Sequence, residues 1–233
     1  MLVGVLAYDR AHLLDRCLDS LTRHAGADYT LVIHRDGDDP EVGAVVKRYA
    51  DRAIVIEPFR RVGITAGLND ILKHRAPGED FVRVDGDVFF LTHGWLRLLA
   101  DGRKDYGLLA PIWTGNTWQD TVWDFLKGFH RPSHIDCDGS PLGGVVFHPG
   151  EVMDKLGGYR NHGRFYGCQE RDYAARVRGL GLKIGYLTSV LIEHPRIPPL
   201  KGDRRAETED ALKAFKRKRS DYEAGLDLYE AVI

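Results

Sequence analysis

The heptapeptide Phe81-Val82-Arg83-Val84-Asp85-Gly86-Asp87 decides the fold, because a short strand-like run leads directly into two carboxylates. Carboxylates at positions i and i+2 of an extended chain project to the same side. The glycine between them has no Cβ, so another backbone or a ligand can approach closely. Two hard oxygen donors at a strand end suit Mg²⁺ or Mn²⁺, and through the metal a phosphate. A plain turn is the alternative, because Asp-Gly is frequent in turns.

The chain before Asp85 alternates between strand and helix patterns. Continuous apolar runs predict buried strands, and apolar residues at helical spacing predict helices. The expected strands cover 2–7, 29–33, 53–56 and 81–84, and the expected helices cover 11–23, 40–49 and 63–74. This alternation predicts a single α/β domain whose mostly parallel central sheet is flanked by helices.

Polar residues follow three of these expected strands. They are Tyr8 to Arg10 after the first, Asp36 to Asp39 after the second, and Asp85 with Asp87 after the fourth. Ligands of parallel sheets bind beyond the carboxyl ends of the strands. Three polar clusters at one sheet edge favour a phosphate and metal site over a plain turn.

The second half of the sequence is less regular. Strands are expected at 106–112, 142–148, 183–186 and 190–193, and a helix at 169–180. Residues 113–138 are rich in Trp, Phe and His without clear periodicity, and a long loop of this kind is usually a lid or a binding surface. Its aromatic side chains either line a sugar or acceptor site or pack in the core. The charged, helix-favouring tail after Pro199 either packs on the domain or joins subunits.

Composition narrows the class of protein. The chain has 233 residues, is 43% hydrophobic and carries a formal net charge of −1, so it can bury a core and has no global field that draws it to nucleic acid. The three cysteines, Cys17, Cys137 and Cys168, are far apart and form no CxxC, which argues against a disulfide framework or zinc site. No stretch approaches the roughly 20 apolar residues of a membrane span. We therefore expect a soluble, cytoplasmic protein.

Common catalytic motifs are absent, which leaves an acidic nucleotide site. The sequence has no GxGxxG after its first strand, no GxxxxGK[ST], no GxSxG and no HExxH. A metal at Asp87 would neutralise a diphosphate leaving group. His194 is either a third ligand or a structural histidine, and Glu170 is either a general base or a residue favoured by the helix dipole. Tyr8 either stacks on a base or packs in the core, and Asp36 either accepts a base N–H or forms a turn.

Several motifs occur in the order and spacing of a known family. The chain resembles inverting glycosyltransferases of family 2, which have the GT-A fold, from about residue 3 to residue 194. The matching segments are Val3–Arg10, Cys17–Leu21, Arg35–Asp38, Gly63–Asn69, Asp85–Asp87, Leu156–Tyr159, Gln169–Arg176, Gly181–Ile184 and His194.

This resemblance implies a GT-A domain over residues 1–200, with a nucleotide-binding half at 1–90 and a catalytic and acceptor half at 91–200, followed by a helical extension at 201–233. It implies metal-dependent transfer of a sugar from a nucleotide-diphosphate sugar, with a UDP-sugar expected, to an acceptor hydroxyl with inversion. The acceptor is left open, and the C-terminal extension is a candidate for joining two copies of the chain.

The resemblance also assigns site residues by type. The nucleotide contacts are Ala7, Tyr8, Arg10, Asp36, Asn69, Asp85 and Gly86. The ligands of Mn²⁺ or Mg²⁺ are Asp85, Asp87 and His194. Glu170 is the base. Apart from the resemblance, the aromatic side chains of Trp113, Trp118, Trp123 and Tyr166 are the candidates for lining the acceptor side.

The chain departs from the family pattern at four positions, where Ala7, Arg35, Leu68 and Gln169 replace Thr, an acidic residue, Arg and an acidic residue. Two of these, Arg35 and Gln169, keep open a catalytically impaired module that binds a sugar nucleotide or a glycan. A sugar-1-phosphate nucleotidyltransferase is a further alternative, although its Gly-x-Gly-Thr-Arg loop after the first strand is absent. Retaining GT-A families share the Asp-x-Asp and the late histidine, so inversion is the expectation from family 2 alone.

Overall fold

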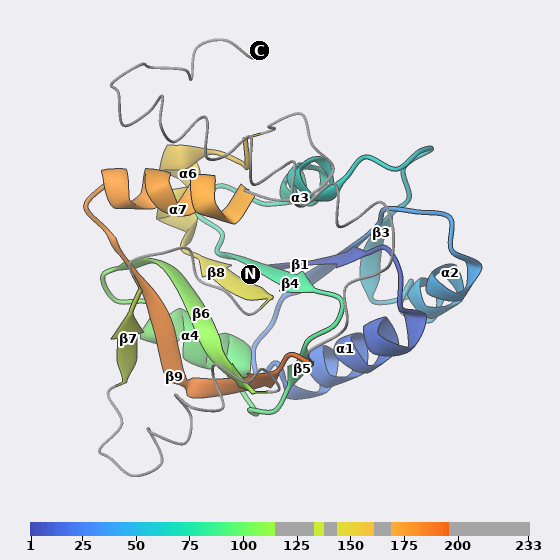
Figure 1. Cartoon of the computed structure of the whole chain (residues 1–233), viewed down its shortest axis with the longest axis horizontal. Helices are drawn as coiled ribbons and strands as arrows, with labels where there is room; N and C mark the ends of the chain where they lie inside the picture. Colours follow the sequence, from blue (N-terminus) through green and yellow to red (C-terminus); the bar gives the residue numbers. More distant parts are fainter. Residues whose placement is uncertain (115–132, 138–143, 161–168, 196–233) are drawn as a thin grey trace.

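The computed structural model describes residues 1–114, 133–137, 144–160 and 169–195 (Figure 1). Its strands are β1 (Leu2–Ala7), β2 (Thr30–Arg35), β3 (Ala53–Ile56), β4 (Phe81–Asp85), β5 (Phe89–Phe90), β6 (Tyr106–Thr114), β7 (His134–Asp136), β8 (Val145–His148) and β9 (Lys183–Glu193). Its helices are α1 (Ala11–His24), α2 (Pro40–Lys47), α3 (Ile64–Leu72), α4 (Trp95–Gly102), α6 (Gly150–Leu156) and α7 (Gln169–Gly179).

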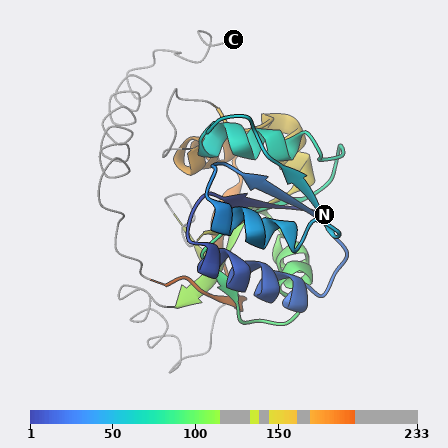
Figure 2. The ribbon, with the colours of Figure 1, turned by 90° about the vertical axis from the view of Figure 1, so that its right-hand side faces the viewer.

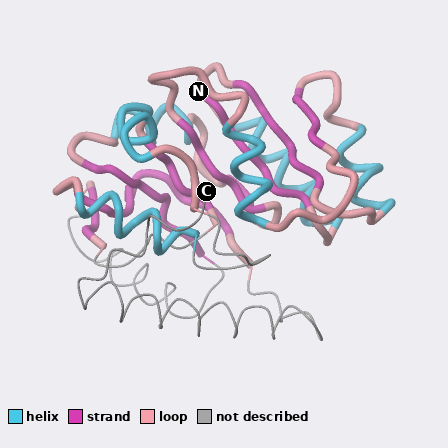
Figure 3. Tube along the Cα trace, turned by 90° about the horizontal axis from the view of Figure 1, so that it is seen from above, coloured by secondary structure: helices cyan, strands magenta, loops and turns pink. Residues whose placement is uncertain are grey.

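All strands of the described residues belong to one sheet. Its order is β3-β2-β1-β4-β8-β6-β9-β5, and β7 pairs with β9. Seen from above, the strands lie side by side along the length of the molecule (Figure 3). Strands β3, β2, β1 and β4 are parallel, as the alternation of strands and helices predicts.

The rest of the sheet is mixed. Strand β8 is antiparallel to both β4 and β6, and β6 is parallel to β9. Strands β4 and β9 therefore point the same way. Their carboxyl ends lie at the same edge of the sheet as those of β1 and β2. The polar residues of the site lie at this edge, which we call the polar edge.

Helices cover both faces of the sheet (Figures 1 and 2). Helices α1, α2 and α4 contribute Leu18, Val45 and Trp95 to the larger hydrophobic core. Helices α3, α6 and α7 contribute Ile71, Met153 and Tyr173 to the smaller core on the opposite face. Hydrophobic burial on both faces explains why the central strands read as continuous apolar runs.

Strand β4 separates these two cores by its alternating side chains. Val82 and Val84 belong to the larger core, and Phe81 belongs to the smaller one. Side chains two positions apart share a face of a strand, so Arg83 lies on the same face as Phe81, under α3, α6 and α7. This places a buried charge, Arg83, on the face that α7 covers.

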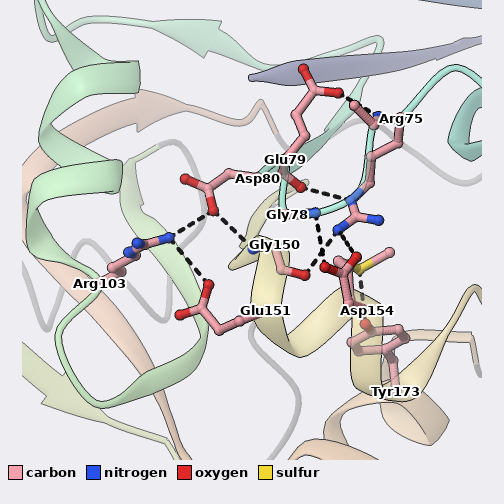
Figure 4. Close-up of polar contacts among 11 residues, drawn as sticks. Arg75, Gly78, Glu79, Asp80, Arg103, Gly150, Glu151, Asp154 and Tyr173 are labelled. Carbon is pink, nitrogen blue, oxygen red and sulfur yellow. Dashed lines mark hydrogen bonds and ion pairs between the residues drawn. The ribbon is translucent and has the colours of Figure 1, made fainter.

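A polar network fastens the amino end of β4, away from the polar edge (Figure 4). Arg75 donates from Nε to the Glu79 carbonyl at 2.6 Å and from Nη2 to the Gly150 carbonyl at 2.8 Å. The same Nη2 lies 2.5 Å from Asp154 Oδ1. Asp80 Oδ1 accepts from the Gly150 amide at 2.8 Å. The network ties the segment before β4 to the start of α6.

The structure differs from the sequence predictions in several elements. A single strand, β9, covers the two segments that were expected to be separate strands, 183–186 and 190–193. It pairs with β6 on both sides of a register shift between Pro111 and Ile112. Elements β5, α4, β7 and α6 were not predicted. Among the described helices, none is both long enough and apolar enough to cross a membrane. The predicted C-terminal extension lies outside the described residues.

Candidate active site

Asp87 lies between two cationic side chains at the polar edge of the sheet. It follows the end of β4, and its Oδ1 lies 3.4 Å from Nε2 of His194, which follows β9. Its Oδ2 accepts a hydrogen bond of 3.1 Å from Nη1 of Arg10, which follows β1. Three residues that are far apart in sequence thus converge because the ends of three strands meet at one edge.

The charges of this cluster support one another. Burial alone would raise the pKa of Asp87, but the hydrogen bond and charge of His194, together with Arg10, outweigh burial and lower it. Burial alone would lower the pKa of His194, but Asp87 and the charge of Asp85 outweigh burial and raise it. Asp87 is therefore held as a carboxylate in a place where positive charge is stabilised.

Local backbone geometry fixes the positions of Arg10 and of the turn that carries Asp85 and Asp87. Arg10 has a left-handed φ of 60°, which is uncommon for a residue other than glycine, and α1 begins at the next residue. Gly86 passes so close to β1 that a Cβ there would lie 3.1 Å from the Leu6 carbonyl oxygen. The Cys17 thiol donates to the Asp85 carbonyl at 3.4 Å, and burial raises its pKa, so it remains a protonated donor. Helix α1 thus supports the Asp85 turn from behind.

Asp85 has a different environment from Asp87. Its amide donates to the Gly144 carbonyl at 2.7 Å, and its Oδ1 contacts Nη2 of Arg83. Burial raises the pKa of Asp85, and the charge of Asp87 adds to this effect against the opposing charge of Arg83. Asp85 is therefore oriented by an arginine of its own strand.

Arg83 connects this carboxylate to the candidate base. Its Nη1 lies 2.5 Å from Oε1 of Glu170, in the first turn of α7. Gln169 also donates to Glu170 Oε1, at 2.8 Å. Sequence analysis did not select Arg83 as a site residue. The signal was present, however, because a charged residue at a core-facing position of an apolar strand requires a buried partner.

The remaining acidic residue of α7 has a structural role. Asp172 is buried and accepts from Nε of Arg176 at 3.0 Å. Arg176 also donates to the carbonyl groups of Leu156 and Gly158, at 2.8 Å and 3.0 Å. This pair holds the turn after α6 against α7, which explains the Asp-x-x-x-Arg spacing of the segment.

Asn69, an expected nucleotide contact that stays a prediction, joins two parts of the fold. Its amide nitrogen donates to the Tyr159 carbonyl at 2.8 Å, and its Oδ1 accepts from the Tyr159 amide at 2.9 Å. Both ends of the side chain are therefore used to join α3 to the segment after α6. Asn69 fastens two parts of the fold.

The expected base-binding residues lie together near the end of β2. Asp36 accepts from the amides of Val62 and Gly63 at 2.6 Å and 2.9 Å, so its carboxylate fastens the loop before α3. The Arg61 guanidinium lies 4.6 Å from the centre of the Tyr8 ring. Base recognition by Tyr8 and Asp36 stays a prediction, and for Asp36 it depends on the remaining lone pairs of the carboxylate.

Two neighbours of this pair are structural. The Ala7 side chain is buried in the larger core, and its carbonyl accepts from the Asp36 amide at 2.8 Å. Arg35 binds Glu57 at 2.9 Å and the Asp39 carbonyl at 3.0 Å, so its guanidinium fastens loops around α2.

Trp113, an expected acceptor residue, lies near the end of β6. Its side chain is 4% exposed and packs in the larger core, with its ring centre 5.6 Å from that of Tyr186. Hydrophobic packing accounts for this burial, and contact with an acceptor stays a prediction. The other predicted acceptor residues, Trp118, Trp123 and Tyr166, lie outside the described residues.

A family model, described as glycosyl transferase family 2, matches residues 2–144, more than half of the chain. The chain belongs to glycosyl transferase family 2. No curated protein matches it in sequence.

Two solved structures show the same fold as this family-2 chain. The mannosyltransferase PcManGT from Pyrobaculum calidifontis, in complex with GDP-Man and Mn²⁺, matches with a TM-score of 0.67 and 18% identity, over 94% of this chain and 64% of its own. GalNAc-T7, with UDP, GalNAc and Mn²⁺, matches with a TM-score of 0.68 and 12% identity, over 95% of this chain and 50% of its own. The family-2 chain thus spans about two thirds and one half of these proteins, and the likeness establishes the GT-A fold.

The donor set of this family-2 protein fits a divalent cation that brings phosphate ligands. Asp87 and His194 face each other, and Asp85 is held nearby by Arg83. Within the described ranges, no three His, Cys, Asp or Glu side chains converge into a complete metal cage. Mg²⁺ is usually bound through one or two carboxylates plus substrate phosphates, and imidazole suits Mn²⁺. The chemistry of these side chains therefore fits either ion.

Proposed function

We propose that this protein is a metal-dependent glycosyltransferase that moves a sugar from a nucleotide-diphosphate sugar, with a UDP-sugar as the first candidate, to an acceptor hydroxyl with inversion. The observation that carries the proposal is the arrangement at the sheet edge. Asp87 with its two cationic neighbours lies at the end of β4, and Glu170 is joined to the same strand end through Arg83. Family membership supports this assignment.

Each group has a role in the proposed reaction. A divalent cation at Asp87 and His194, with Asp85 beside them, would neutralise the diphosphate as it leaves. Arg10, which contacts Asp87, would contact the same phosphates. Glu170 takes the proton of the acceptor hydroxyl. The acceptor oxygen bonds to the anomeric carbon while the bond from that carbon to the diphosphate oxygen breaks on the opposite face.

The remaining assignments complete the proposal. Tyr8 and Asp36 hold the base at the end of β2, and the backbone at Gly86 contacts the nucleotide. The GT-A domain covers residues 1–200, with the nucleotide in 1–90 and the acceptor in 91–200. The acceptor side includes Trp118, Trp123 and Tyr166, and the extension at 201–233 joins two copies of the chain. The protein acts in the cytoplasm.

Nucleotide binding tests the donor site directly. The melting temperature should rise with UDP or GDP in the presence of Mn²⁺ and rise less without it, because a ligand that binds only the folded state stabilises it. The variant Asp87→Asn should lose the metal-dependent part of the rise. The matched control Asp19→Asn, at an exposed ion pair on α1, should retain it. If neither nucleotide gives a metal-dependent rise, the proposal is wrong.

Glu170→Gln tests the base. Removal of a general base typically lowers turnover by about 10²–10⁴-fold, whereas the melting-temperature rise with nucleotide and Mn²⁺ should remain. Glu151→Gln is the matched control, because Glu151 lies in the first turn of another helix, α6. Unchanged transfer by Glu170→Gln would contradict the assignment of the base.

A second candidate is a module that binds sugar nucleotides without transferring sugar. The observation that favours it is the engagement of Glu170 Oε1 by both Arg83 and Gln169. Release of free nucleotide from labelled donor, in the presence of acceptor extracts, separates the two. Wild-type protein that binds nucleotide with Mn²⁺ but releases none would favour the binding module.

A further inference from the structure

Arg83 is a buried charge in the middle of the sheet. It is 5% exposed, and in the register of β4 it lies opposite Gly4 of β1 and Val146 of β8. Removing a guanidinium from water costs several kcal/mol, and only close ionic partners compensate for this. An apolar residue at this position would pack in the core without that cost. The charge therefore requires an explanation other than packing.

The two ends of the guanidinium reach different carboxylates. Nη2 contacts Asp85 Oδ1, two residues along the same strand face, and Nη1 lies 2.5 Å from Oε1 of Glu170 on α7. The guanidinium is planar and its donors have fixed directions, so one group sets both contacts at once. Asp85 belongs to the donor side of the proposed reaction, and Glu170 belongs to the acceptor side.

We propose that Arg83 is a positioning residue that fixes Glu170 relative to Asp85, and thereby the base relative to the donor; this inference rests on the proposed function. Arg83 contacts both carboxylates and influences the reaction only through their positions. Transfer requires the acceptor oxygen, its base and the anomeric carbon in near-attack geometry, and a displacement of about 1 Å can cost about 100-fold in rate. A bridge of fixed length between the two carboxylates supplies that geometry.

The test compares Arg83→Lys and Arg83→Gln with the wild-type protein. Lysine keeps the charge but offers a single ammonium on a flexible stem, which cannot bridge the two carboxylates in a fixed plane. We expect kcat for sugar transfer to fall by about 100-fold in Arg83→Lys while the donor KM changes little. Affinity for Mn²⁺ in the presence of UDP or GDP, followed by the electron paramagnetic resonance of free Mn²⁺, should fall far less than kcat, because Asp87 and His194 contact each other and not Arg83.

Arg75→Lys is the matched control. Arg75 is also a largely buried arginine that pairs with one carboxylate and two backbone carbonyls, but at the opposite end of β4 (Figure 4). It should lose stability as Arg83→Lys does and retain the wild-type kcat.

The possible outcomes separate the two proposals. If the wild-type protein neither binds a nucleotide with Mn²⁺ nor transfers sugar, the proposed function fails, and the role of Arg83 fails with it. If the wild-type protein transfers sugar and Arg83→Lys keeps a wild-type kcat, only the role of Arg83 is refuted. A fall in kcat matched by equal losses in Arg75→Lys, or loss of the fold in both Arg83 variants, also refutes it, because stability alone would explain the result.

Discussion

Replacing Arg176 with methionine tests how the carboxyl half of the fold is held together. The guanidinium donates to Asp172 at 3.0 Å and to the carbonyl groups of Leu156 and Gly158 at 2.8 Å and 3.0 Å. Methionine retains much of the apolar stem but none of these donors. One substitution therefore removes the counter-charge of Asp172 and the connection between α7 and the turn after α6.

The magnitude follows from the burial of Asp172, which is 4% exposed. A hydrogen bond to a charged group contributes about 1.5–3 kcal/mol. The two carbonyl groups belong to residues that are at least partly exposed, so their loss adds less. Small domains unfold with about 5–15 kcal/mol, so Arg176→Met should still fold, with its free energy of unfolding lowered by about 1.5–3 kcal/mol.

A double-mutant cycle isolates the ion pair. The double variant loses the contact between the two side chains only once, so Arg176→Met combined with Asp172→Leu should lose less than the sum of the single changes. We expect a coupling of about 1.5–3 kcal/mol, the upper part of the range for contacting residues. Urea unfolding followed by circular dichroism measures all four proteins. Arg178→Met, at an exposed position of the same helix, should stay within about 0.5 kcal/mol of the wild-type value.

Two results would refute this reasoning. A loss below about 1 kcal/mol in Arg176→Met would mean that water replaces the lost donors, since that is the ordinary net worth of a single hydrogen bond. Additive single changes would mean that Asp172 and Arg176 do not stabilise each other, and the spacing of the α7 segment would then need another explanation.

Two other substitutions test the packing and the pH dependence. A Cβ on Gly150 would lie 2.1 Å from the Gly78 carbonyl oxygen, so Gly150→Ala should lower the free energy of unfolding in urea by about 1–3 kcal/mol. At Gly179 a Cβ would meet no atom of another described segment within 4 Å, so Gly179→Ala should not lower it, and equal results for the two variants would contradict the clash. Burial, followed by the charge of Arg83, lowers the pKa of His148 from 6.5 to about 3. Because the unfolded chain then binds a proton that the folded protein does not, stability falls as the pH drops below 6.5, by about 2 kcal/mol at pH 5. His148→Gln removes this dependence, so its stability relative to the wild-type protein should rise by that amount between pH 8 and pH 5 in urea unfolding; parallel pH profiles would contradict it.

The parallel half of the fold was predictable because its strands are short apolar runs between polar segments. Residues 2–7 and 53–56 are two such runs, and both are strands with these bounds, although only the first is almost fully buried and the second is the edge strand β3. Helix α1 was also predicted, since Leu14, Leu18 and Leu21 recur at helical spacing and are all buried. The same local patterns do not reveal that β8 reverses direction, because strand direction depends on connections that the sequence pattern does not show.

The roles of individual polar residues were less predictable because they depend on distant partners. Asn69 is joined to Tyr159, which lies 90 positions later, and Arg83 to Glu170. Neither pairing leaves a local pattern in the sequence. The burial of Trp113 was unpredictable for a related reason, since an aromatic side chain suits both a sugar face and a core.

The two aspartates of Asp85-Gly86-Asp87 show where the local rule ends. Side chains at i and i+2 share a face only while the chain is extended, and β4 ends at Asp85, with a turn beginning at Gly86. Asp85 remains in the sheet and meets Arg83, whereas Asp87 leaves it and meets His194 and Arg10. The pKa of Asp85 is raised, mainly by burial, while that of Asp87 is lowered because its cationic neighbours outweigh burial. Two residues that look equivalent in sequence therefore have different chemistry. We infer that Asp87 is the direct metal ligand. Arg83, which contacts both Asp85 and Glu170, holds Glu170 in a fixed position relative to the end of β4.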